Sequence, residues 1–83
     1  MDEGALAAVR RFPAQQRLIE TLAASDESFQ SLCDDLAAAE TALAGWQAST
    51  AAVREARCAG YRDLVEDLVR EIEVALRSGR HDD

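Results

Sequence analysis

Two long stretches of this chain carry apolar residues at alternating spacings of three and four, and this repeat limits the possible fold more than any other feature. Such a repeat places one apolar stripe along a helix, as in coiled coils. The first stretch, over about 26–47, has its stripe at Phe29, Leu32, Leu36, Ala39, Leu43 and Trp46. The second stretch, over about 51–77, has its stripe at Cys58, Tyr61, Val65, Leu68, Ile72 and Ala75. The sequence therefore predicts two long helices.

A short segment, GWQAST from Gly45 to Thr50, separates the two stretches. Ser49 and Thr50 are good helix N-caps, and Gly45 can loosen the end of the helix before them. Two long helices joined by a short turn form an antiparallel hairpin. The chain is rich in alanine and lacks the period-two alternation of a half-buried strand, so the predicted fold class is all-α.

The second stripe is broader than a single partner helix can cover, because Leu64, Val69 and Leu76 extend it sideways. Either the N-terminal segments fold back over the hairpin, or two hairpins pair. We favour pairing into a homodimeric, coiled-coil-like four-helix bundle. The residues expected to form the partner or oligomer interface are Phe29, Leu32, Leu36, Leu43, Trp46, Tyr61, Val65, Leu68, Ile72 and Leu76.

The first part of the chain is predicted to form short helices over 2–24, interrupted at Phe12–Pro13. A residue before proline avoids the helical region, whereas proline itself is accepted in the first turn of a helix. Pro13 therefore opens a second short helix that reaches about Ala24. Ser25 and Asp26 follow as N-caps of the first long helix. The apolar positions of the two short helices are Leu6, Val9, Leu18, Ile19 and Leu22.

The whole chain, 1–83, is predicted to be one small helical domain that ends in a flexible polar tail over 78–83. It has no run of about 18 apolar residues, which a membrane-spanning helix needs. Asp2 and Glu3 stand where a secretory signal would be basic. We therefore expect a cytoplasmic protein.

The chain is acidic, with a net charge of -7 from 16 acidic and 9 basic residues. All nine of these basic residues are arginines, and the chain has no lysine. Nucleic acids and anionic membranes repel such a chain, so neither is an expected partner. The arginine and alanine usage suggests a GC-rich bacterial genome. Arg10, Arg11 and Arg17 form a small basic island, which is either a solvated, paired face or a contact for an anion or partner.

The sequence shows no catalytic or metal-binding pattern, so we expect no enzyme activity, no metal and no cofactor. His81 is the only histidine and lies in the tail, so no ordered base accompanies either cysteine. Asp34 and Asp35 are adjacent on a helix and point about 100° apart, so they do not converge on one ion. Gly60 is either a tolerated defect or a place where another helix approaches closely.

Cys33 and Cys58 lie on the apolar stripes and are expected to act as small hydrophobic residues. In a hairpin that turns near residue 48, their positions along the axis differ by about 9 Å. This exceeds the roughly 4.4–6.8 Å between the Cα atoms of a disulfide, so an intramolecular bridge is not expected. An intermolecular bridge remains open.

Several short motifs resemble those of the YdcH-like family of small bacterial helical proteins. They are Phe12–Pro13, the Ser-Asp-x-x-Phe-x-x-Leu pattern from Ser25 to Leu32, and LVREIEVAL from Leu68 to Leu76. The resemblance covers most of residues 9–76 and implies a helical hairpin that tends to self-associate. The family's lysines and histidine are missing from the hairpin here, and no biochemical role follows from the resemblance.

From these features we expect a non-enzymatic, self-associating protein-interaction or accessory module, with a homodimer as its oligomeric state. The alternative, based on the net charge of -7, is an acidic regulator or chaperone that shields a basic protein partner. Trp46, beside the turn, is either part of the core or an exposed anchor for a partner.

Overall fold

The computed structural model describes residues 2–80, and these residues form helices and turns without a strand. The all-α prediction is confirmed. The elements are α1 (Glu3–Arg11), the short 3-10 helix η1 (Pro13–Gln15), α2 (Gln16–Ser25), α3 (Glu27–Gln47) and α4 (Arg54–Arg80).

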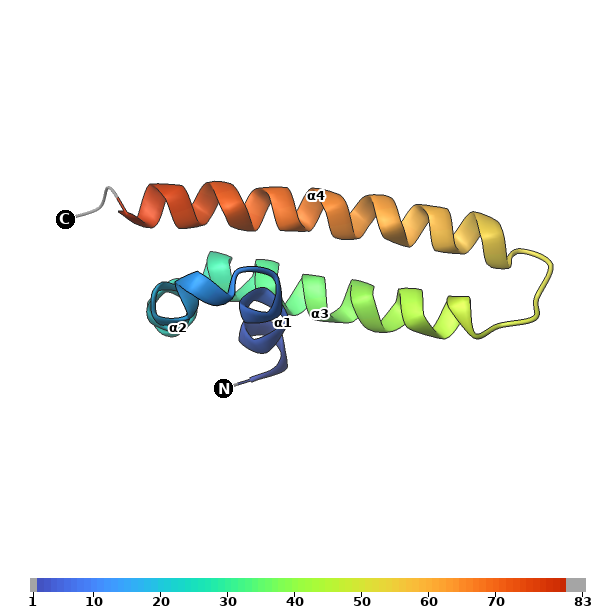
Figure 1. Cartoon of the computed structure of the whole chain (residues 1–83), viewed down its shortest axis with the longest axis horizontal. Coiled ribbons are helices and arrows are strands. Elements are labelled where there is room, and N and C mark those ends of the chain that lie inside the picture. The colour runs from blue at the N-terminus through green and yellow to red at the C-terminus, as the bar shows by residue number, and fades with distance from the viewer. Residues whose placement is uncertain (1, 81–83) are drawn as a thin grey trace.

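The two long helices, α3 and α4, lie side by side and run in opposite directions, joined by a turn at one end of the molecule (Figure 1). The described chain is elongated, with extents of 50 × 22 × 21 Å. α1 and α2 are seen nearly end-on in Figure 1, so they cross the long helices steeply. Both lie near the N-terminal half of α3, and the half beside the turn has no third layer (Figure 1).

Side-chain caps fix where α1 and α3 begin. The Asp2 carboxylate accepts a hydrogen bond from the backbone N–H of Ala5 at 2.8 Å. The Asp26 carboxylate accepts from the N–H groups of Ser28 and Phe29, at 2.9 and 3.2 Å. Each cap satisfies N–H groups that have no partner within the helix, so the predicted boundary at Ser25–Asp26 is correct, with Asp26 as the cap.

Phe12 and Pro13 separate α1 from α2, as the sequence predicts. Phe12 leaves the helical region, with φ −132° and ψ 63°, and its N–H still donates to the carbonyl of Ala8. Pro13 then begins the single turn of η1. The resulting change of direction lets α1 and α2 both contact α3.

One hydrophobic core joins all four α-helices. Its fully buried large side chains include Ile19 from α2, Phe29 and Leu36 from α3, and Ile72 and Leu76 from α4. The fully buried core residues of α1 are small, Ala5, Ala7 and Ala8, and its Val9 is partly buried against the core. Toward the turn the core ends at Ala39 on α3 and Val65 on α4, with Tyr61 packed against it.

Two predicted boundaries of α4 are wrong. The helix begins at Arg54 rather than near Ala51, because residues 51–53 belong to the turn. In that turn the Ser49 hydroxyl accepts from the N–H of Ala51, and the Arg54 side chain donates to the carbonyl of Gln47. Ser49 therefore shapes the turn instead of capping the helix directly.

At its other end α4 continues to Arg80, so residues 78–80 are helical and not part of a flexible tail. The physical reason is packing against α2. A Cβ atom added at Gly79 would lie 3.1 Å from Cδ1 of Leu22 and 3.7 Å from Cδ1 of Leu18. The small residue lets the last turn of α4 rest on α2. The remainder of the predicted tail, 81–83, with His81, lies outside the described residues.

Candidate interaction surface

Most residues predicted as a partner interface lie inside a single chain. Phe29, Leu36, Val65, Leu68, Ile72 and Leu76 are all buried in the core, and no partner can reach them without unfolding. The N-terminal helices supply the layer that a second hairpin was expected to provide. The other four predicted residues, Leu32, Leu43, Trp46 and Tyr61, are half-buried.

The half of the hairpin beside the turn is the least covered part of the described chain. We call residues 40–64 the arm; it comprises the last part of α3, the turn and the first part of α4. No charged residue occurs between Thr41 and Val53. Charge depletion of this kind is typical of the centre of a protein interface. Within the arm, the Arg57 guanidinium lies over the Trp46 ring, 5.8 Å from the ring centroid, in a cation–π arrangement.

Four large apolar side chains are exposed among the described residues: Leu6, Val53, Leu64 and Val74. Three of these lie along α4 or just before its first residue. They are Val53, Leu64 and Val74, with exposed fractions of 48%, 43% and 53%. The Val53 carbonyl accepts the N–H of Arg57, so Val53 continues the helix geometry at the start of α4.

These three residues belong to a second repeat on α4, which we call the outer stripe. Its members are Val53, Arg57, Gly60, Leu64, Asp67, Glu71 and Val74, spaced alternately by four and three. Every member is exposed. The spacing keeps all seven on one flank of the helix. The spacing of the outer stripe is present in the sequence and could have predicted it. The neighbouring stripe is more apolar and is the one that the sequence analysis identifies.

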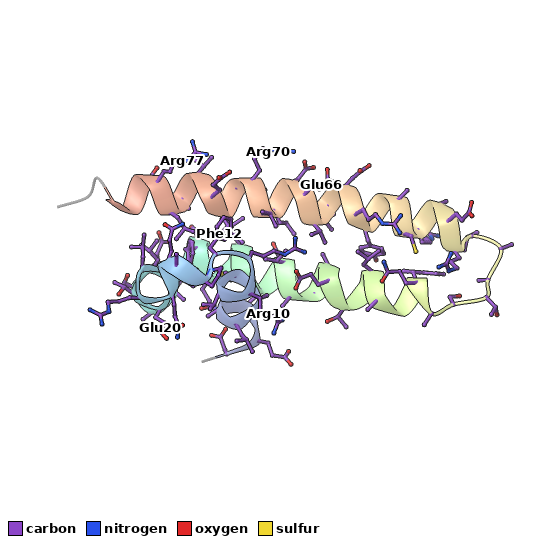
Figure 2. All side chains as sticks on the ribbon, viewed as in Figure 1. Arg10, Phe12, Glu20, Glu66, Arg70 and Arg77 are labelled. Carbon is purple, nitrogen blue, oxygen red and sulfur yellow. The ribbon has the colours of Figure 1, made fainter. Side chains whose placement is uncertain are left out.

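Charged residues of α4 border the outer stripe. Glu66, Arg70 and Arg77 project from α4 on the side away from α3 (Figure 2). Both arginines pair within the helix, Arg70 with Asp67 at 3.1 Å and Arg77 with Glu73 at 3.3 Å. The second of these pairs has the acid-before-base spacing of four that supports a helix.

A shallow groove of about 570 Å³ borders the outer stripe near its C-terminal end. It lies between α3 and α4 and is lined by Leu32, Asp67, Arg70, Glu71, Val74 and Ala75. α1 packs elsewhere on α3, where Gly4 meets the backbone at Cys33 and Asp34. Leu32 points at least about 100° away from those two positions around the helix, so α1 leaves the groove open.

The arginine island does not converge on a site. Arg11 donates to the Glu40 carboxylate through Nε and Nη2, at 3.0 and 2.8 Å, and this pair ties α1 to α3. Arg10 and Arg17 are exposed and form no ion pair within residues 2–80. Arg10 projects from α1 in Figure 2. The island is therefore mainly a structural link with two solvated cations.

Neither cysteine has the environment of a nucleophile. Both are free and buried, Cys33 in the core and Cys58 in the arm outside the core cluster. Burial, followed by the nearby carboxylates of Asp2 and Asp34, raises the pKa of the Cys33 thiol to about 11. A thiol of this kind stays protonated at neutral pH.

Over residues 2–80, no group of three His, Cys, Asp or Glu side chains is placed to hold a metal ion. In the same part of the chain, no helix combines the length and apolar character needed to cross a membrane. Comparison of the sequence with family models and curated proteins, and of the fold with solved structures, finds no match.

Proposed function

We propose that this protein is a non-enzymatic helical interaction module, in which the outer stripe of α4 receives another helical surface. The observation that carries the proposal is the repeat of exposed Val53, Leu64 and Val74 on a helix whose other apolar stripe is already buried in its own core. Exposed apolar side chains along one flank of a helix can mark a place where a partner binds. Pairing of two hairpins through α4 would form a four-helix bundle.

Two further observations bear on the cellular location and the origin of the proposed module. Both cysteines are free thiols, as is usual for proteins of a reducing compartment, and this supports a proposed cytoplasmic location. The motifs around Phe12–Pro13 and Ser25–Asp26, which resemble the YdcH-like family, mark helix boundaries here. They support a bacterial helical hairpin. They do not indicate a partner, which we propose binds the outer stripe.

A site-specific crosslinking experiment tests the function. A photoreactive phenylalanine analogue replaces Leu64 in one variant and Arg62 in a matched control, and both are irradiated in cells. Positions 62 and 64 point about 160° apart on α4, so only position 64 faces the proposed partner. We expect a discrete protein adduct from position 64 and none from position 62. The absence of an adduct at position 64 would contradict the proposal.

A second candidate function is supported by the charge of α3. This helix carries four acidic residues, Glu27, Asp34, Asp35 and Glu40, and no basic residue, whereas α4 has equal numbers of both. We propose as the alternative that the exposed face of α3 shields a basic protein. Affinity for such a partner falls steeply with salt, because exposed charges are screened within about 10 Å at 0.1 M. A salt-independent complex would contradict this alternative.

A further inference from the structure

The two ends of the outer stripe carry charges of opposite sign. Arg57 lies toward the turn, and Asp67 and Glu71 lie toward the C-terminus, with Leu64 between them. The apolar residues Val53 and Val74 stand at the two extremes. The stripe is therefore complementary to its own reverse, with Leu64 at the centre.

From this symmetry we infer that the partner of the outer stripe is α4 of a second copy, packed antiparallel across a two-fold axis beside Leu64. The inference rests on the proposed function and names its partner. In this register Leu64 faces Leu64 of the second copy, and Val53 faces Val74. Arg57, whose guanidinium also lies 5.8 Å from the Trp46 ring centroid of its own chain, faces Glu71 of the second copy, so each dimer contains two such oppositely charged pairs by symmetry.

The same residues disfavour a parallel pair. A parallel register would place Arg57 against Arg57, Asp67 against Asp67 and Glu71 against Glu71 in successive layers of the interface. Like charges at such positions act against the wrong orientation. The stripe thus selects one orientation as well as one partner.

Gly60 acquires a role in this arrangement. A Cβ atom added there would meet nothing within 4 Å, so its small size serves no contact inside the chain. In the antiparallel register Gly60 faces Asp67 of the second copy. A glycine at that layer lets the helices approach while the Asp67 carboxylate keeps its 3.1 Å pair with Arg70.

One feature opposes the dimer. Asp63 flanks the stripe beside Leu64, so the two-fold axis brings two Asp63 carboxylates to the same edge of the interface. Their repulsion is a weak, solvent-screened effect. It predicts that Asp63→Asn tightens the dimer, by about threefold.

The association itself is measured by sedimentation equilibrium of the full chain. The stripe offers three large apolar side chains from each copy, so we expect a weak dimer with a dissociation constant on the order of 10–100 µM. Leu64→Glu places two carboxylates on the axis and weakens the dimer about a hundredfold. Leu64 is 43% exposed, so the chain keeps its helical circular dichroism and thermal unfolding. Arg62→Glu, on the opposite flank of α4, leaves the dissociation constant unchanged.

Charge exchange tests the register. Arg57→Glu and Glu71→Arg each turn both attractive pairs into repulsive ones, and each weakens the homodimer about tenfold. In an equimolar mixture, the new acid of the R57E chain faces the new base of the E71R chain, and the unchanged Arg57 and Glu71 form the second pair. We expect the mixture to dimerise as tightly as the native protein. A mixture no tighter than either variant alone would overturn the register.

The two-fold axis is tested by Leu64→Cys. The introduced thiols face one another, so mild oxidation should convert the variant into a disulfide-linked dimer. Arg62→Cys is the control and should not link, and native Cys33 and Cys58 are buried and should not contribute. Failure of Leu64→Cys to link at concentrations where the native chain dimerises would overturn the axis.

The outcomes separate this inference from the proposed function. A native chain that remains monomeric up to about 1 mM overturns the homodimer. If the crosslinker at position 64 then still captures a different protein, the interaction module stands with another partner. If it captures nothing, both proposals fail.

Discussion

At the scale of single residues, the contact between α1 and α3 requires a glycine at position 4. A Cβ atom at Gly4 would lie 2.8 Å from the backbone nitrogen of Asp34 and 3.0 Å from the carbonyl carbon of Cys33. Backbone atoms cannot move aside as a flexible side chain can. Gly4→Ala should therefore lower the free energy of unfolding by about 1–3 kcal/mol, as overpacking does. Urea denaturation monitored by circular dichroism measures the change.

Gly45→Ala is the matched control, because a Cβ atom there would meet nothing within 4 Å. At this helical position alanine should raise the free energy of unfolding by about 0.5–1 kcal/mol. Opposite signs for the two variants would verify that α1 depends on close approach to α3. Equal effects would contradict it.

Asp2 gives the chain a specific dependence on pH. The hydrogen bond from the Ala5 N–H, aided by one from the Gln30 side chain, lowers the pKa of Asp2 below its usual 3.8. The stabilisation from the charged cap is thus fully present above pH 3.8 and is lost as the pH falls through the lower pKa of the folded state. Asp2→Asn keeps a capping side chain that does not titrate.

We therefore expect the native chain to be more stable than Asp2→Asn at neutral pH and the difference to shrink below about pH 4. Urea denaturation at several pH values measures this difference. A carbon-detected NMR titration of the Asp2 carboxyl gives its midpoint directly. A midpoint at or above the usual value would contradict the structural reason.

At the scale of elements, α1 buries its small residues and exposes a large apolar one, whereas most helices bury their large apolar residues. Its buried residues are Gly4, Ala5, Ala7 and Ala8, whereas Leu6 is 41% exposed. Leu6→Ala should therefore change the free energy of unfolding by no more than about 0.5 kcal/mol. Ala8→Leu, at a fully buried position, should cost about 1–3 kcal/mol by overpacking. Thermal unfolding of the two variants checks the order, and a larger loss for Leu6→Ala would contradict it.

The same helix shows why part of the fold was beyond sequence analysis. The long stripes and the boundaries at Phe12–Pro13 and Ser25–Asp26 are strong local signals, and they predict the helices and their order, although not the two ends of α4. Alanines and a glycine carry no apolar periodicity, so the sequence indicates Leu6 and Val9 as the inward residues of α1. Val9 is partly buried against the core, whereas Leu6 is exposed. The packed face is set by the close approach of Gly4 to the backbone of α3, which is a tertiary contact and not a local pattern.

The candidate site was missed for a related reason. From the sequence, the stronger stripe, including Ile72 and Leu76, is assigned to a partner, because one helix cannot cover it. In the structure α1 and α2 complete that coverage within the chain. Whether a short N-terminal helix folds back depends on tertiary packing, which a local pattern does not record. The weaker stripe at Val53, Leu64 and Val74 remains for a partner.

At the scale of the whole molecule, stability should be uneven along the hairpin. The core joins four helices around Cys33 and ends near Ala39 and Val65, whereas the arm consists of two helices around Cys58. A region with fewer buried contacts opens locally at a lower free energy than the global unfolding transition. Each buried cysteine therefore reports on one half of the molecule.

Thiol labelling under native conditions should modify Cys58 before Cys33. Opening of the arm exposes Cys58, whereas Cys33 needs opening of the core, and the Cys33 thiol also has a pKa raised to about 11. Peptide mass spectrometry after a timed pulse of iodoacetamide measures the two rates, and the unfolded chain in urea supplies the reference for each. If α4 pairs with a second copy, raising the protein concentration should slow the labelling of Cys58, since the dimer stabilises the arm, and this protection should be lost in Leu64→Glu. Equal labelling of both cysteines would show instead that the arm and the core open together as one cooperative unit.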